Sequence, residues 1–265
     1  MSVQDLLLGE RQALIRTRLD LSGRVIAAEL AQELGVSEDT IRRDLREMAS
    51  AGLCRRVYGG ALRISQSQVS MTERIAIGGE RKAALAISAA ALLPAGSNVF
   101  LDAGSTNLAL ARALPVGADM TVVTNAPAIA AAVLERDIRT IQLGGVIDPA
   151  VGGAVGAKAL RDAEAFRPDI LVLGVCGIDA EAGVTAYSFE DAEFKRFLAS
   201  RSKSVLIAVT NDKLSTAAPY SVVPLSRVTR AVIEADADDA EAAALAGAGI
   251  ETIRASYPSQ ATDLP

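Results

Sequence analysis

The stretch that decides the fold of the first sixty residues is 34–45, LGVSEDTIRRDL. Gly35 and Val36 form a tight corner, and Ser37 is placed to cap a following helix through its hydroxyl group. Residues 28–34, before the corner, are compact and helix-forming. The predicted order is therefore helix, turn, helix, the order by which many proteins place a helix in the DNA major groove.

The helix that begins after Ser37 has two different faces at 100° per residue. One face carries the apolar residues Ile41, Leu45 and Met48. The opposite face carries the arginines Arg42, Arg43 and Arg46. A guanidinium group can form bidentate hydrogen bonds to guanine or bind a phosphate, so this face has the chemistry to read a major groove. The alternative is that the arginines only solvate an exposed helix face.

The segments on either side extend this unit. Residues 9–19 have apolar positions at helical spacing and predict a first helix, which ends before Gly23. Residues 53–63, LCRRVYGGALR, predict two short extended pieces around a Gly-Gly turn with basic flanks, which is the pattern of a wing. The residues expected to contact DNA are Ser37, Asp39, Thr40, Arg42, Arg43, Arg46, Arg55, Arg56 and Tyr58.

The charge is distributed unevenly along the chain. The net charge is −5, but residues 1–64 hold ten arginines, no lysine and nine acidic residues. The excess of acidic residues lies in the remainder, where it would keep non-specific DNA binding low. Glu38 and Asp39 suit the positive end of the helix dipole and are expected beside the backbone contacts or facing base edges.

Composition excludes several classes of protein. Half of the residues are apolar, which is enough for a substantial core, but no run approaches the roughly 20 apolar residues that span a bilayer. The N-terminus does not resemble a signal peptide, so we expect a cytoplasmic protein. Cys54 and Cys176 lack metal-ligand spacing, and the chain has no histidine, the commonest general base. We expect no metal site, no cofactor and no catalytic residues.

The remainder of the chain predicts a second domain. Residues 64–80 form a polar stretch that we expect to link residues 1–63 to a domain over 81–265. Apolar runs that read as strands alternate there with helical segments, which predicts an α/β fold with a largely parallel sheet. The runs are 98–101, 121–124, 140–143, 170–175, 204–209 and 230–233.

Small polar residues follow several of these strands, at the edge where ligands bind in such folds. Residues 102–106, DAGST, lead from a strand into a helix, so their amides and hydroxyl groups can hold a phosphate. Further close approach of a ligand to the backbone is expected at Thr124, Asn125, Gly144, Gly145, Gly174 and Gly177. The alternative is a set of glycine turns with hydroxyl helix caps.

The first unit resembles the DeoR-type bacterial transcription regulators. The matching residues are Glu10-Arg11-Gln12, Glu29-Leu30-Ala31, 34–45 and Gly59-Gly60-Ala61. Tyr58 departs from the family, which usually has histidine before Gly-Gly-Ala. The resemblance implies a winged helix-turn-helix DNA-binding domain.

In the second domain, the stretches 101–106, 122–125, 143–145, 174–179, 183–185 and 188–195, together with Lys213, also resemble that family. In the family this domain senses a phosphorylated sugar or related metabolite and is similar in fold to ribose-5-phosphate isomerase and coenzyme A transferases. The resemblance implies that Asp102, Gly104, Ser105 and Thr106 frame the phosphate, with contacts from Lys195, Lys213 and Glu190. Lys195 also lies four residues after Asp191, so an intrahelical ion pair is an equal alternative. The family usually has Gly-Thr-Thr near Asp102, and an aspartate where this chain has Thr210.

Three functions fit these features. The first is a metabolite-responsive repressor of a carbohydrate or related operon, a homo-oligomer that binds double-stranded operator DNA. The second is a sugar-phosphate isomerase that uses Glu190 or Asp102 as its base, which leaves the arginine-faced helix and the wing unexplained. The third gives the second domain an oligomerisation role without a ligand, and a thermal-shift assay with sugar phosphates distinguishes it from a sensor.

Overall fold

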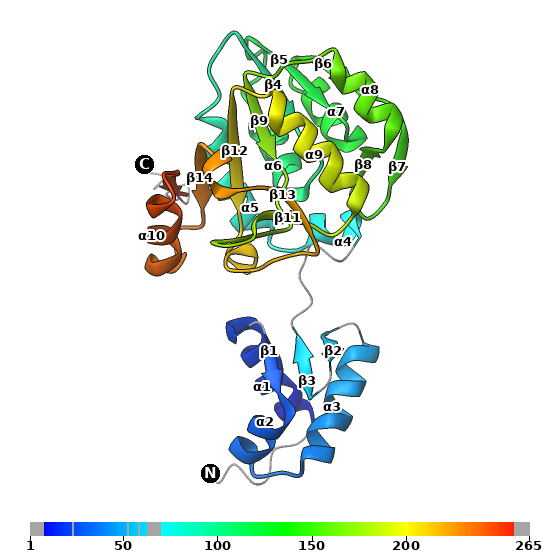
Figure 1. The fold of residues 1–265 in the computed structure, drawn as a ribbon, viewed down its shortest axis with the longest axis vertical. Coiled ribbons are helices and arrows are strands. Elements are labelled where there is room, and N and C mark those ends of the chain that lie inside the picture. Colours follow the sequence, from blue (N-terminus) through cyan, green and yellow to red (C-terminus); the bar gives the residue numbers. More distant parts are fainter. Residues whose placement is uncertain (1–7, 23, 52, 58, 63–69, 257–265) are drawn as a thin grey trace, which may run out of the picture. The chain divides into compact units, whose positions relative to one another are not determined.

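The computed structural model describes residues 8–22, 24–51, 53–57, 59–62 and 70–256 (Figure 1). The chain forms two compact units, Met1–Gln66 and Ser67–Pro265. The predicted order of domains, a helix-turn-helix followed by an α/β domain with a parallel sheet, is confirmed.

The first unit is a three-helix fold with a small sheet. Its elements are α1 (Leu8–Ser22), β1 (Arg24–Ile26), α2 (Ala27–Leu34), α3 (Glu38–Ser50), β2 (Arg55–Val57) and β3 (Gly60–Leu62). Gly35 ends α2 with a φ of 65°, a left-handed conformation that suits glycine, and Ser37 Oγ accepts a hydrogen bond from the Thr40 N–H to start α3. The strands β2 and β3 form the predicted hairpin, and β1 adds a third strand in the order β1-β3-β2.

The core of this unit comes from the apolar faces of its helices. The completely or almost completely buried residues include Ile15, Leu19, Ile41, Leu45 and Met48. Gly60 allows β3 to lie against β1, because a Cβ at that position would be 2.0 Å from the carbonyl oxygen of Val25. The sequence pattern therefore predicted the apolar face of α3 and the hairpin of the wing, whereas the close approach of β1 that requires Gly60 is seen only in the structure.

The second unit is built on a seven-stranded sheet in the order β15-β14-β12-β9-β4-β5-β6, and every neighbouring pair is parallel. The strands are β4 (Ser97–Leu101), β5 (Met120–Thr124), β6 (Arg139–Gln142), β9 (Ile170–Leu173), β12 (Ser204–Val209), β14 (Arg230–Ile233) and β15 (Glu251–Arg254). The first six coincide with the predicted strands to within two residues at each end. The seventh, β15, was not predicted.

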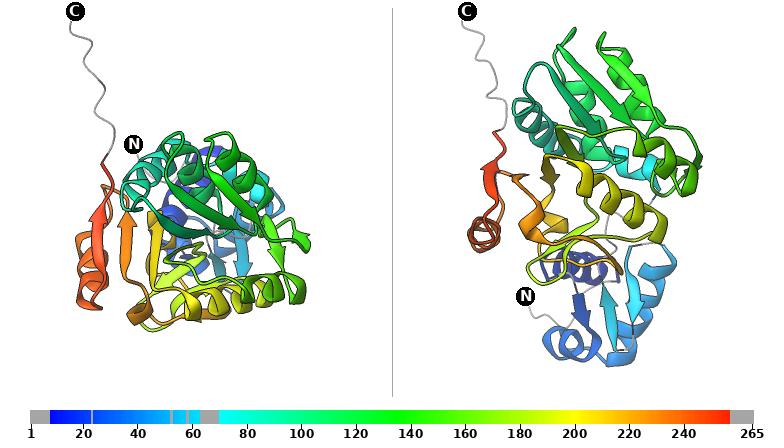
Figure 2. Two further views of the ribbon diagram at one scale, coloured as in Figure 1. Left: turned by 90° about the horizontal axis from the view of Figure 1, so that it is seen from above. Right: turned by 45° about the horizontal axis from the view of Figure 1, so that its top comes forward.

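Helices cover both faces of this sheet (Figures 1 and 2). One face packs against α5 (Gly79–Ala90), α6 (Ser105–Ala113) and α7 (Pro127–Leu134). The other packs against α8 (Ala157–Glu164), α9 (Phe189–Arg201) and α10 (Asp239–Gly247). Within β4, Val99 and Leu101 join the first core and Phe100 joins the second, as expected because successive strand side chains point to opposite faces.

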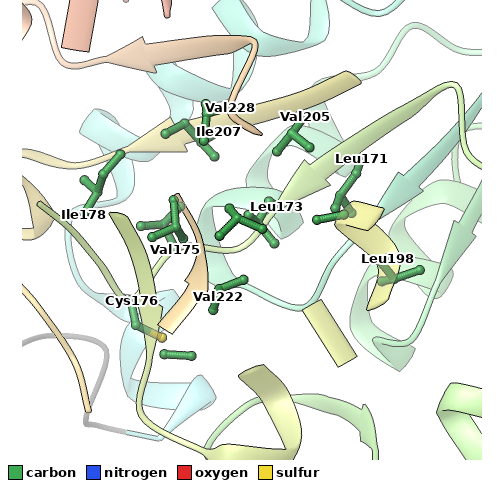
Figure 3. Packing of buried hydrophobic residues seen from close by; sticks show 14 of the residues in the cluster. Leu171, Leu173, Val175, Cys176, Ile178, Leu198, Val205, Ile207, Val222 and Val228 are labelled. Atoms are coloured by element: carbon green, nitrogen blue, oxygen red, sulfur yellow. The ribbon is translucent and has the colours of Figure 1, made fainter. Parts of the chain in front are cut away.

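Two smaller sheets complete the unit. A three-stranded antiparallel sheet, β10-β11-β13, comprises β10 (Gly177–Asp179), β11 (Gly183–Ala186) and β13 (Tyr220–Val223), and its apolar side chains join the core on the α9 face (Figure 3). A hairpin pairs β7 (Val146–Asp148) with β8 (Gly153–Val155). In the described part of the chain no helix is both long enough and apolar enough to cross a membrane.

The stretch 64–80, which the sequence predicts as a linker, contains structure in its second half. Residues 63–69 lie outside the described part, but α4 (Met71–Ala76) follows, and α5 begins at Gly79. Ser70 and Glu73 form a capping box, in which the Ser70 hydroxyl accepts from the Glu73 N–H and the Glu73 carboxylate accepts from the Ser70 N–H. Hydrogen bonding at Ser70 lowers the pKa of Glu73.

Candidate functional site

The arginine face of α3 is exposed as predicted. Arg42, Arg43 and Arg46 lie on the side opposite the buried Ile41 and Leu45. Arg42 makes an exposed ion pair with Glu38, one turn earlier, at 2.8 Å. Exposed pairs of this kind are worth little, so Arg42 can exchange Glu38 for a DNA phosphate at small cost.

The start of α3 is organised by two of the expected DNA contacts. The hydroxyl groups of Ser37 and Thr40 lie 2.8 Å apart, and the Thr40 N–H donates to Ser37 Oγ at 3.1 Å. Asp39 is exposed beside them. Ser37 is therefore first of all the cap of the helix, and any DNA contact through its hydroxyl would be additional.

A buried ion pair that the sequence did not reveal ties α1 to α3. Asp44 is 1 % exposed, and Arg11 donates to both of its carboxylate oxygens, through Nε to Oδ2 and through Nη2 to Oδ1 at 3.1 Å. The hydrogen bond to Asp44 raises the pKa of Arg11. Asp44 occupies a core position of α3, which explains why an acidic residue interrupts the arginines.

The wing supplies the remaining expected DNA contacts. Arg55 and Arg56 lie on β2, and Arg56 is exposed. Tyr58 lies outside the described residues.

A pocket of about 140 Å³ opens at the carboxyl ends of β4, β9 and β12. Six of the residues predicted to bind an effector line it: Gly104, Ser105, Thr106, Gly174, Lys195 and Lys213. Asp102 lies beside them and is completely buried. The lining also includes Arg74, Tyr187, Ser188 and Asp191.

Lys195 is the central cation of the pocket. Its Nζ lies 2.5 Å from Asp191 Oδ2 and 3.7 Å from Asp102 Oδ2, and all three side chains are almost fully buried. Burial alone would lower the pKa of Lys195, but the carboxylates of Asp191 and Asp102 outweigh it and raise that pKa. The predicted intrahelical pair therefore forms, and the same lysine also lines the pocket.

Asp102 is buried next to this lysine, outside the pocket lining. Its Oδ1 accepts from the Ala103 N–H at 2.9 Å and its Oδ2 from the Gly174 N–H at 2.8 Å. Burial raises the pKa of Asp102 to about 6, while Lys195 and the two amides act in the opposite direction. Gly174 is required here, because a Cβ would lie 2.5 Å from the Ala103 carbonyl oxygen.

Three polar atoms in the pocket lining are buried without a hydrogen-bond partner: Arg74 Nε, Thr106 Oγ1 and Asp191 Oδ1. Buried polar atoms in native proteins almost always have a partner. These atoms comprise a cationic donor, a hydroxyl group and a carboxylate acceptor. Together they match a ligand that carries both an anionic group and hydroxyl groups.

Arg74 and Lys213 add positive charge to this pocket. Both are buried, and burial lowers the pKa of each. Among the described residues neither forms an ion pair with a carboxylate within 4 Å. The sequence did not identify Arg74, because it falls within the stretch predicted as a linker.

Helix α6 points its first turn at the same pocket. Its N-cap, Gly104, provides no side chain to cap the helix, and Ser105, Thr106 and Asn107 of the first turn all line the pocket. The uncapped N–H groups at a helix start carry partial positive charge and favour an anion. In the described part of the chain, no group of three or more Cys, Asp or Glu residues is arranged to hold a metal ion.

The other predicted effector residues do not line the pocket: Thr124, Asn125, Gly144, Gly145, Gly177 and Glu190. Thr124 Oγ1 donates to the Leu101 carbonyl at 2.6 Å, and Asn125 bridges the Ala103 N–H and the Ala154 carbonyl. The hydrogen bonds of these two residues hold the loop after β4 in place.

The remaining four have other surroundings. Gly144 and Gly145 precede β7 and face α8, and Gly177 packs tightly against Thr216. Glu190 is exposed, and its carboxylate accepts from the Ser188 hydroxyl at 3.2 Å.

Comparison with known proteins bears on both units. Residues 11–67 match the family model for a DeoR-like helix-turn-helix domain, and residues 78–235 match that for the DeoR C terminal sensor domain. The glycerol-3-phosphate regulon repressor of Escherichia coli K12 is 33% identical over 208 residues, which cover 78% of this chain and 82% of the relative. A putative aga operon transcriptional repressor of Escherichia coli O157:H7 is 27% identical over 249 residues, covering 92% and 93%.

Solved structures are more distant. Ribose 5-phosphate isomerase A from Methanocaldococcus jannaschii has a TM-score of 0.38 and 13% identity, over 51% of this chain and 54% of the isomerase. The sorbitol operon regulator SorC from Klebsiella pneumoniae has a TM-score of 0.37 and 11% identity, over 80% and 92%. Similarity this low carries no information on function. The family matches, which extend over most of the chain, do carry such information. The protein belongs to the DeoR family, whose members are transcription regulators and not enzymes.

Proposed function

We propose that this regulator represses a carbohydrate or related catabolic operon in the cytoplasm, and that a phosphorylated sugar or similar metabolite controls its binding to the operator. The observation that carries the proposal is the pocket, where Arg74, Lys195 and Lys213 surround the uncapped start of α6. Two carboxylates balance Lys195, but Arg74 and Lys213 have no such partner among the described residues. A phosphate group would supply the missing negative charge.

The chemistry of the lining divides the proposed ligand into two parts. The phosphate lies at Gly104, Ser105 and Thr106, within reach of the cationic side chains. The hydroxyl groups of the ligand donate to Asp191 Oδ1, which has no partner in the protein. The names of relatives such as the glycerol-3-phosphate regulon repressor are consistent with a small polyol or sugar phosphate.

On the DNA side, we propose that α3 enters the major groove with Arg42, Arg43 and Arg46, and that Arg55, Arg56 and Tyr58 of the wing contact the backbone. Two copies of the chain would place two such helices on the two half-sites of one operator, which makes a homo-oligomer the expected form. Effector binding would then shift the population between arrangements of different DNA affinity.

A mobility-shift assay at stated salt tests the DNA half, with DNA from the region upstream of the protein's own gene and a panel of sugar and polyol phosphates. We expect sequence-preferring binding that one phosphate alters. The Arg42→Ala, Arg43→Ala double variant should lose this binding. An Arg161→Ala, Arg167→Ala double variant, which removes the same charge from exposed positions of the second unit, should keep it.

Two results would contradict the proposal. If the protein shows no sequence-preferring binding to this DNA at any salt concentration or with any effector, it does not regulate the region upstream of its own gene. Binding that no phosphate alters, with no thermal stabilisation by any of them, would instead favour a second unit that serves oligomerisation alone.

A further inference from the structure

Arg74 differs from the other cations of the pocket in its position along the chain. It lies on α4, the first element described after residues 63–69, and those residues join the two units in sequence. Lys195 is on α9 and Lys213 follows β12, so both belong to elements anchored on the large sheet. An anion that contacts Arg74 therefore contacts the segment that leads to the DNA-binding unit.

Helix α4 rests on the loop between β7 and β8, which forms part of the pocket wall. The Met71 N–H donates to the Pro149 carbonyl at 3.3 Å. Gly152, with a φ of 80°, leaves space for the Met71 side chain, since a Cβ there would be 2.6 Å from Met71 Cγ. Ala150 and Val151 of the same loop line the pocket.

The guanidinium group of Arg74 holds this arrangement together with only part of its bonding capacity. Its Nη2 donates to the carbonyl oxygens of Ala150 at 2.5 Å and Val151 at 3.0 Å, while Nε is buried without a partner. At the other end of α4, Lys82 Nζ donates to the carbonyl oxygens of Arg74 and Ile77. A buried guanidinium whose partners are neutral carbonyl groups gains most from an added anion.

We propose that Arg74 couples the effector to the DNA-binding unit: its guanidinium binds the anionic group of the ligand and thereby fixes α4, and with it the start of the connection to residues 1–63. This inference rests on the proposed function, because it requires an anion in this pocket. A ligand shifts an equilibrium only by the interactions that differ between the two states. Arg74 supplies that difference, whereas Ser105, Lys195 and Lys213 supply affinity.

Hydrogen exchange of the full chain, followed by mass spectrometry, tests the proposal with inorganic phosphate as the probe and chloride at equal ionic strength as the reference. In the unmodified protein, saturating phosphate should slow exchange in peptides covering 70–78 and 102–108, each by roughly tenfold. In Arg74→Gln, saturating phosphate should still slow 102–108 and should leave 70–78 unchanged. Arg74→Lys, which keeps the charge but not the planar fork, should show partial slowing at 70–78.

Arg227 offers a matched control. Like Arg74 it donates to backbone carbonyl oxygens, those of Ala199 and Ser202, but it does not line the pocket. Arg227→Gln should therefore respond to phosphate as the unmodified protein does, which separates loss of a structural arginine from loss of the coupling.

The outcomes are distinguishable. If phosphate slows 102–108 but not 70–78 in the unmodified protein, or slows 70–78 equally in Arg74→Gln, the coupling role is overturned and the proposed function stands. If phosphate slows neither peptide in the unmodified protein, the pocket binds no phosphate, and both the proposed effector class and the role of Arg74 are wrong.

Discussion

Replacing Lys195 by methionine removes the cation that lies between two buried carboxylates. Methionine has a similar length and no charge, so Asp191 and Asp102 would remain in the core without their shared partner, at 2.5 and 3.7 Å from the lost amino group. Breaking a buried ion pair by removing one partner costs about 3–5 kcal/mol. We expect the free energy of unfolding of the second unit to fall by that amount at pH 8.

The loss should depend on pH in a defined direction. Burial already raises the pKa of Asp102 to about 6, and loss of Lys195 would raise it further. Between pH 6 and the new pKa, the folded variant would hold a proton that the unfolded chain has released. Protonated Asp102 therefore stabilises the folded variant at low pH, and this contribution is lost as the pH rises. The stability deficit of Lys195→Met relative to the unmodified protein should grow by up to about 1.4 kcal/mol per pH unit above pH 6.

Urea unfolding of the full chain at pH 5.5 and pH 8, following the transition of the second unit, measures this deficit. Lys203→Met is the matched control, because Lys203 forms its ion pair with Asp169 at 2.7 Å on the surface, where a pair is worth about 0–1 kcal/mol. A deficit for Lys195→Met below about 1 kcal/mol and equal at both pH values would refute the account of a charged, buried triad.

Three further predictions concern DNA, pH and the pocket lining. Arg43→Ala should lower the slope of log affinity against log salt by about 0.9 in fluorescence anisotropy if the side chain contacts one phosphate, and an unchanged slope would exclude that contact. Affinity for a phosphate ligand should fall in calorimetry as the pH rises from 7 toward 10.5, the ordinary pKa of lysine, because burial lowers the pKa of Lys213 in the pocket and a neutral lysine no longer attracts the anion; constant affinity over that range would argue against cationic recognition. Gly174→Ala should destabilise the second unit by about 1–3 kcal/mol and abolish ligand binding, since its Cβ would lie 2.5 Å from a backbone oxygen. Gly247 has open space around it, so Gly247→Ala should keep the stability and the ligand affinity of the unmodified protein in the same assays.

Local patterns predicted the elements of the fold well. The capping residue Ser37, the corner at Gly35 and the apolar face of α3 are encoded within twelve residues, and the structure contains each of them. Within the large sheet, β4, β5, β9, β12 and β14 were recognisable as short apolar runs because both of their faces are largely buried. The edge strand β6 was also predicted, although its residues are mostly exposed. Strand β15 is half-exposed and polar, which explains why no apolar run marked it.

Long-range contacts account for what the sequence did not show. Arg74 lies in a polar stretch beside Gly78 and Gly79, and its partners Ala150 and Val151 are more than seventy residues away. Asp44 sits between surface arginines, and only the folded unit brings Arg11 to it. Glycine after a strand was a weak guide, because Gly174 faces the pocket while Gly145, with a φ of 140°, serves the turn into β7.

The central claim is that one pocket links a phosphorylated ligand to DNA affinity, and reciprocity tests it most directly. The phosphate that alters the mobility shift would be titrated into the free protein and into the protein saturated with its DNA site, with affinity measured by calorimetry. Linkage requires the ligand affinity to change by the same factor by which the ligand changes the DNA affinity, and typical couplings are about 5- to 150-fold. We predict equal factors in the two directions. Equal ligand affinity for free and DNA-bound protein would contradict the claim, because a ligand that does not distinguish the two states cannot control the binding of DNA.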